Sequence, residues 1–94
     1  MVMNYTPEID EEVLVEEKVD IESHELVVFN DDVNTFDNVI EALVQICNHS
    51  LEQAEQCTLI IHYKGKCAVK LGSFSALAAM RNAICDRGIS AEVF

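Results

Sequence analysis

The chain of 94 residues is half hydrophobic and carries a formal net charge of −11 at pH 7. This length is enough for one compact domain with a single core. Residues 1–22 hold a net charge of −7 and residues 23–94 only −4, and neither part has the basic patch that binding to phosphate groups requires. The composition therefore argues against nucleic acid and anionic membrane surfaces as partners and favours a basic or amino-terminal ligand.

The four cysteines, Cys47, Cys57, Cys67 and Cys85, lie within predicted helices or strands and form no Cys-x-x-Cys pair. We therefore predict no metal site, no disulfide and no cofactor, and we expect buried thiols that act as small apolar side chains. The sequence has neither a run of about 20 apolar residues nor the pattern of a secretory signal. These features predict a cytoplasmic protein that does not span a membrane.

Residues 1–22 are acidic and show no hydrophobic period, so we expect a flexible N-terminal extension ahead of a folded domain over residues 23–94. The apolar run at residues 26–29 predicts a strand over residues 24–30, which ends at an Asn-Asp-Asp turn. Asn34 and Asp37 form a capping-box-like pair, which predicts that Asn34 caps a first helix. The apolar stripe of this helix consists of Phe36, Val39, Ile40, Leu43, Ile46 and Cys47.

Residues 51–64 have two interpretations. Ser50 and Gln53 repeat the capping pattern and Gly65 is a typical helix stop, which predicts a second helix. The run at residues 58–63 is instead rich in β-branched side chains, and with a turn at Gly65 it predicts a hairpin strand. The residues by themselves leave this choice open.

The remaining sequence predicts a strand, a helix and a last short strand. Cys67, Val69 and Leu71 alternate with Ala68 and Lys70, which is typical of a half-buried strand. Ser73 or Ser75 then caps a third helix that stops at Gly88, and residues 89–94 supply the last strand. The apolar face of the third helix consists of Ala76, Leu77, Met80, Ala83 and Ile84.

The loop after the first strand is the candidate recognition element. Residues 30–35 offer two carboxylates, two amides and a hydroxyl on short side chains. Binding groups are often found on loops that neighbouring elements hold rigid. We therefore expect this loop to bind a ligand.

Two motifs lie about 30 residues apart: Val-Val-Phe-Asn-Asp-Asp at residues 27–32 and Ile-His-Tyr-Lys-Gly-Lys at residues 61–66. Together they resemble the ClpS family of bacterial adaptor proteins, over about residues 24–94. The resemblance implies an α+β fold, a two-layer β-α-α-β-α-β domain whose small antiparallel sheet is covered by helices on one face. It also implies that residues 51–64 are helical, so that Thr58, Ile61 and His62 share one face.

The resemblance implies a non-catalytic, monomeric adaptor. ClpS proteins bind N-degron substrates, which begin with Leu, Phe, Tyr or Trp, and deliver them to the N-terminal domain of a Clp AAA+ unfoldase, ClpA or ClpC, for degradation by ClpP. By similarity, Asn30, Asp31 and His62 clamp the substrate α-amino group, and Asp32 and Asn34 support the loop. By similarity, the hydrophobic pocket for the first side chain consists of Phe36, Val39, Thr58, Ile61 and Ile89.

The sequence departs from the family pattern at three places. Asn34-Thr35-Phe36 stands where many members have Thr-Pro-Met, and Thr58 stands where members often have Met. Ser75 and Met80 occupy positions where relatives carry an acid and a Lys that dock on the unfoldase. We expect these substitutions to alter the pocket and the docking surface.

Two other classes of function fit part of the sequence. An enzyme that uses Asp31, Asp32 and His62 as acid, base or metal ligands would lack a nucleophile motif and a phosphate loop. A non-catalytic assembly module, resembling the C-terminal domain of the bacterial ribosomal stalk protein, would have the same fold without a pocket. The pair of motifs favours the adaptor over both.

Overall fold

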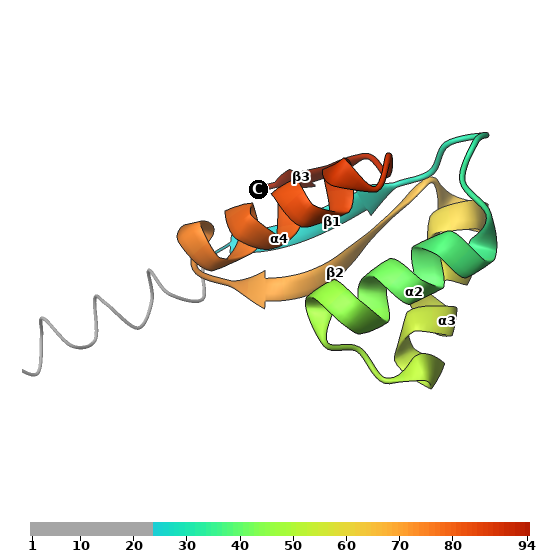
Figure 1. Ribbon diagram of the computed structural model, residues 1–94, viewed down its shortest axis with the longest axis horizontal. Helices are drawn as coiled ribbons and strands as arrows, with labels where there is room; N and C mark the ends of the chain where they lie inside the picture. The colour runs from blue at the N-terminus through green and yellow to red at the C-terminus, as the bar shows by residue number, and fades with distance from the viewer. Residues whose placement is uncertain (1–23) are drawn as a thin grey trace, which may run out of the picture.

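The computed structural model describes residues 24–94, so the flexible extension expected over residues 1–22 lies outside the described residues. Over this range the elements follow the β-α-α-β-α-β order that the ClpS resemblance implies, which confirms the α+β fold (Figure 1). In chain order they are β1 (His24–Phe29), α2 (Phe36–Cys47), α3 (Leu51–Lys64), β2 (Lys66–Gly72), α4 (Phe74–Asp86) and β3 (Ala91–Val93).

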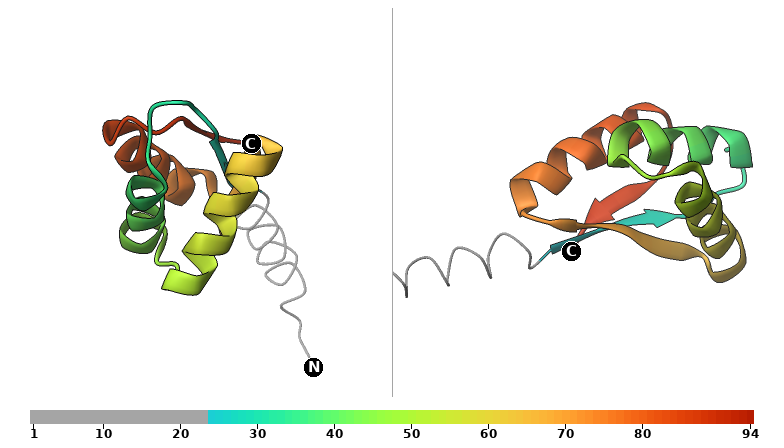
Figure 2. Two further views of the ribbon diagram at one scale, coloured as in Figure 1. Left: turned by 90° about the vertical axis from the view of Figure 1, so that its right-hand side faces the viewer. Right: turned by 90° about the horizontal axis from the view of Figure 1, so that it is seen from below.

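The strands form an antiparallel sheet in the order β2-β1-β3, with β1 at its centre. Helix α4 lies along β1 and β3, whereas α3 packs against β2 and α2 packs against α3 (Figure 1). Figure 2 (right) shows α2 and α4 on one side of the strands. Among the described residues, each helix is too short or too polar to cross a membrane.

Each helix begins at a hydroxyl that accepts a backbone N–H from its first turn. Thr35, Ser50 and Ser73 are the capping residues of α2, α3 and α4. The prediction that Asn34 caps the first helix is wrong, because the side chain of Asn34 forms other hydrogen bonds and Thr35 accepts the N–H of Asn38 instead. The capping residue also places the start of α2 immediately after the loop.

Residues 51–64 form a helix and not a hairpin strand. Ser50 accepts the backbone N–H of Gln53 as predicted, and Gly65 ends the helix with a φ of 94°, a conformation that favours glycine. The hydroxyl of Thr58 donates to the carbonyl of Ala54, 2.8 Å away within the same helix. The helix-capping interactions at Ser50 and Gly65 therefore outweigh the strand preference of the β-branched residues between them.

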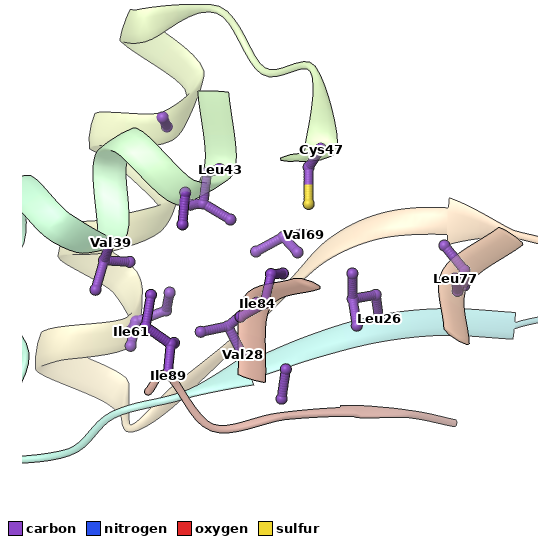
Figure 3. Packing of buried hydrophobic residues seen from close by; sticks show 13 residues of the cluster. Leu26, Val28, Val39, Leu43, Cys47, Ile61, Val69, Leu77, Ile84 and Ile89 are labelled. Carbon is purple, nitrogen blue, oxygen red and sulfur yellow. The ribbon is translucent and has the colours of Figure 1, made fainter. Parts of the chain in front are cut away.

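A single core joins all six elements (Figure 3). Leu26 and Val28 of the central strand are fully buried, and Leu43, Leu77 and Ile84 from the helices are each 1% exposed. Burying one such side chain contributes about 1.5–3 kcal/mol relative to leaving it in water. Of the cysteines, Cys47 is buried and Cys85 is exposed, which corrects the expectation that all four thiols are buried.

Strand β2 contains a bulge at Val69. The register of β1 with β2 shifts by one residue between Leu26 and Val27, which leaves Val69 without a partner residue. Beyond the bulge, Leu71 pairs with the exposed Glu25 and is itself 69% exposed. The predicted alternation of Val69 and Leu71 on one buried face is therefore wrong at Leu71.

The bulge also anchors the connection between α2 and α3. The buried imidazole of His49 donates from Nε2 to the carbonyl of Val69 at 2.7 Å, and Lys70 donates from Nζ to the carbonyl of Cys47 at 3.0 Å. These two bonds hold the C-terminal end of α2 on the sheet. The N-terminal end of the same helix directly follows the candidate recognition loop.

Candidate functional site

A cavity of about 280 Å³ opens where the loop after β1 meets α2 and α3. Nine of the ten predicted site residues line this cavity, although they come from two separate stretches of the chain, residues 30–39 and 58–62. Its lining consists of Phe29, Asn30, Asp31, Asp32, Asn34, Thr35, Phe36, Val39, Thr58, Ile61 and His62.

Ile89 is the predicted pocket residue that the lining does not include. It is 2% exposed and packs in the core cluster that also contains Val39 and Ile61 (Figure 3). Its predicted place in the lining is therefore corrected: Ile89 supports the apolar side of the site from within the core. Phe29 and Thr35 line the cavity but were not predicted, and their only signal in the sequence was their position at the two ends of the loop.

The carboxylate of Asp31 organises the loop. Its Oδ1 accepts the backbone N–H groups of Val33 and Asn34 at 2.9 and 2.8 Å, and its Oδ2 accepts the side-chain amide of Asn34 at 2.8 Å. The backbone N–H of Asn34, then its amide and then the N–H of Val33 lower the pKa of Asp31 below the ordinary value, because each hydrogen bond favours the charged form. The loop is thus folded around an ionised carboxylate.

Asn34 ties this loop to two neighbouring elements. Its Nδ2 also donates to the carbonyl of Gly88 at 2.8 Å, between α4 and β3, and its Oδ1 accepts the amide of Asn38 on α2 at 2.6 Å. At the start of the loop, the N–H of Asn30 donates to the carbonyl of Gly65 at 2.9 Å. The loop is therefore fixed before any ligand arrives, which lowers the ordering cost of binding.

The two carboxylates of the loop differ in their free acceptor capacity. Three of the roughly four acceptor positions of the Asp31 carboxylate are already used by loop donors. Asp32 is exposed at the same cavity, and its carboxylate accepts no hydrogen bond from residues 24–94. Asp31 therefore shapes the loop, while Asp32 keeps its acceptors free.

His62 and Phe36 meet at the mouth of the cavity. Their rings lie edge to face with centroids 5.1 Å apart, and the centroid of the Tyr63 ring lies 4.8 Å from that of the His62 ring. Phe36 is 42% exposed, whereas Val39 and Ile61 behind it are 9% and 3% exposed. The cavity therefore has a polar edge, formed by His62 and the loop, and an apolar interior.

Thr58 belongs to the apolar interior in spite of its hydroxyl. It is 3% exposed, and its O–H is used by the carbonyl of Ala54 within α3. A ligand that enters this cavity meets acceptors at the edge and mostly carbon inside, an arrangement that suits a cationic group attached to an apolar side chain. Within residues 24–94, no three His, Cys, Asp or Glu side chains are grouped to hold a metal ion.

A protein-family model described as ATP-dependent Clp protease adaptor protein ClpS matches residues 20–91. The chain belongs to the ClpS family. This assignment confirms the resemblance drawn from the two motifs, and ClpS proteins are adaptors rather than enzymes as a family.

Curated relatives agree with the assignment over a shorter stretch. The ATP-dependent Clp protease adapter proteins ClpS of Campylobacter jejuni strains 81-176 and RM1221 are each 45% identical to this chain over 42 residues, which is 45% of this chain and 44% of theirs. The chain thus matches less than half of the length of these relatives.

A solved structure, that of Agrobacterium tumefaciens ClpS2 bound to L-phenylalaninamide, superposes with a TM-score of 0.73 over 76% of this chain and 93% of that chain. The two sequences are 14% identical, so this likeness establishes a shared fold.

Proposed function

We propose that this protein is an adaptor for N-degron substrates. It binds proteins that begin with Leu, Phe, Tyr or Trp and delivers them to a Clp AAA+ unfoldase for degradation by ClpP. The observation that carries the proposal is the cavity between the loop and α3, where free acceptors stand beside a buried apolar interior. Membership of the ClpS family and the ligand of A. tumefaciens ClpS2, an amino acid amide with a free α-amino group, support it.

The α-ammonium of the substrate binds at the polar edge of the cavity. Asn30, Asp31 and His62 form the clamp, and we add Asp32 because its carboxylate has no competing donor within residues 24–94. An ammonium offers three donors, and each bond to a carboxylate is charge-assisted and about twice as strong as a neutral one. Asn34 contributes by holding the loop.

The first side chain of the substrate fills the apolar interior, formed by Phe36, Val39, Thr58 and Ile61. The whole cavity, which includes the polar edge, has a volume of about 280 Å³, compared with about 150 Å³ for an apolar cavity that binds benzene in an engineered protein. A phenyl or isobutyl group therefore fits, and its burial contributes about 1.5–3 kcal/mol.

Delivery completes the proposed function. The partner is the N-terminal domain of ClpA or ClpC, and the adaptor acts as a cytoplasmic monomer without a cofactor or catalytic residues of its own. In this proposal the acidic residues 1–22 contact the unfoldase during transfer of the substrate.

Fluorescence anisotropy with a panel of peptides tests the proposal. The peptides differ only in the first residue, which is Leu, Phe, Tyr, Trp, Met, Ile, Ser or Glu. We expect Kd values near micromolar for the first four and binding at least about tenfold weaker for Ser and Glu, which leave the apolar interior unfilled or bury a charge. Equal affinity for Phe and Ser peptides would contradict the proposal.

A further inference from the structure

A second hollow lies on the outer side of α2, next to the candidate site. It is a shallow groove of about 590 Å³, and Leu51 at its far end is 62% exposed. We call it the α2 groove, and its lining consists of Asp37, Asn38, Ile40, Glu41, Val44 and Leu51. None of these residues belongs to the proposed clamp or pocket.

The α2 groove and the candidate site share a wall. Asn38 lines the groove and donates a hydrogen bond of 2.6 Å to Asn34, which lines the cavity. Phe36 and Asp37 are neighbours in the first turn of α2, and the first lines the cavity while the second lines the groove. The groove therefore begins within one helical turn of the mouth of the cavity.

The α2 groove combines negative charge with an apolar strip. Asp37 is exposed and forms no ion pair within residues 24–94, and Glu41 is only partly neutralised by Arg87, 3.4 Å away, because its side chain stays 61% exposed. Ile40 and Val44 follow each other at a spacing of four on the same helix and lead toward Leu51. Lys and Arg match this surface best, because their aliphatic stems pack on apolar groups while their charged ends stay in water beside carboxylates.

We propose that the α2 groove binds the substrate segment that follows the N-terminal residue and that it selects Lys or Arg there. This inference rests on the proposed function, which places the first substrate residue in the adjoining cavity. Glu41 and Val44 lie about 7.5 and 12 Å along the helix from Phe36, and an extended chain advances about 3.3–3.6 Å per residue. The selected residues are therefore the third to the fifth of the substrate.

Three peptides that begin with Phe and carry Lys, Gln or Glu at positions three to five test the inference. Their Kd values are measured by anisotropy with the full chain at low salt. We expect the Lys peptide to bind about fivefold more tightly than the Gln peptide, and the Glu peptide about fivefold more weakly, as exposed charge pairs allow. In the variant Asp37→Asn/Glu41→Gln the spread between the three peptides should fall below about twofold, because the paired charges are gone.

A matched control removes the same charge from the sheet. Glu25→Gln/Glu92→Gln changes two exposed acidic residues of β1 and β3 that line neither the cavity nor the groove. This control should keep the full spread between peptides. An equal loss of the spread in both double variants would overturn the inference, because the net charge of the domain would then be the cause.

The remaining outcomes separate the inference from the proposed function. Equal Kd values for the three peptides would overturn the proposed role of the α2 groove and leave the proposed function unaffected. No binding by any of the three would overturn the proposed function itself. Sedimentation that detects a dimer in the wild-type protein and a monomer in Asp37→Asn/Glu41→Gln would assign the groove to a second copy of the chain and overturn the inference.

Discussion

The side-chain amide of Asn34 donates a hydrogen bond of 2.8 Å to the carboxylate of Asp31. The same amide nitrogen donates to the carbonyl of Gly88, so this one pair both closes the loop and attaches it to the segment before β3. The shape of the polar edge of the site therefore depends on a side chain that does not have to touch the ligand.

Asn34→Ala removes this attachment. We expect it to weaken binding of a Phe peptide about tenfold and to lower the free energy of unfolding by about 1–3 kcal/mol, since it deletes three side-chain hydrogen bonds. Asn38→Ala, which deletes only the bond to Asn34, is the matched control and should have a smaller effect on both. Urea unfolding and anisotropy measure the two quantities. Wild-type affinity in Asn34→Ala would contradict the positioning role.

The two loop carboxylates are expected to respond differently to amide substitution. Asp31→Asn should lower the melting temperature as well as the affinity, because the charge accepts three hydrogen bonds in the folded loop. A loss of about 1 kcal/mol corresponds to roughly 4–8 °C for a domain of this size. Asp32→Asn should weaken binding severalfold and leave the melting temperature unchanged. The reverse pattern would assign the free acceptor to Asp31.

The pH dependence of binding follows from two groups, the carboxyl group of Asp31 and the α-amino group of the peptide. Hydrogen bonds lower the pKa of Asp31 in the folded loop, so their stabilisation is fully present above the unfolded pKa of about 4 and is lost as the pH falls through the lower folded value. Asp31 therefore sets no limit between pH 5 and 8. The α-amino group of the peptide has a pKa of about 7.7–8.0 and must be charged to bind, so Kd should rise about tenfold per pH unit above pH 8. A constant Kd from pH 7 to 9.5 would exclude recognition of the charge.

Thr58 offers a test of the pocket interior. Because its hydroxyl hydrogen is used by the carbonyl of Ala54, Thr58→Val should leave the affinity for both Phe and Tyr peptides within about twofold. Thr58→Met adds volume to the interior and should weaken Phe and Trp peptides more than Leu peptides. A selective loss of affinity for the Tyr peptide in Thr58→Val would mean that the hydroxyl oxygen of Thr58 contacts the substrate.

Local signals explain why the order of the elements was predictable. Ser50 and Gly65 mark both ends of α3, and the apolar stripe of α2 has clear helical spacing. The choice between helix and strand at residues 58–63 needed the family resemblance, because half of that run is β-branched and favours a strand. Nine of the ten predicted site residues lie in or near the two motifs and line one cavity, whereas Ile89 lies away from both motifs and packs in the core.

Contacts between distant segments of the chain explain why the predictions for Asn34 and Leu71 are wrong. The sequence predicts that Asn34 caps α2, but its side-chain amide donates to the carbonyl of Gly88 instead. Gly88 lies 54 positions further along the chain, so no local sequence pattern predicts this hydrogen bond. The bulge at Val69 turns Leu71 outward, and the buried His49 that bonds the bulge carbonyl lies 20 residues before it. Both features depend on segments that meet only in the folded domain.

The most direct test of the central proposal compares two ligands that differ in one group. A peptide of about ten residues that begins with Phe is titrated with a free and with an N-acetylated α-amino group, under identical conditions at pH 7. Acetylation removes the charge and leaves the clamp acceptors unpaired, so we predict an affinity at least about a hundredfold lower, in line with the loss of a charged hydrogen-bond partner from a polar site. Equal Kd values for the free and the acetylated peptide would contradict recognition of the N-terminus.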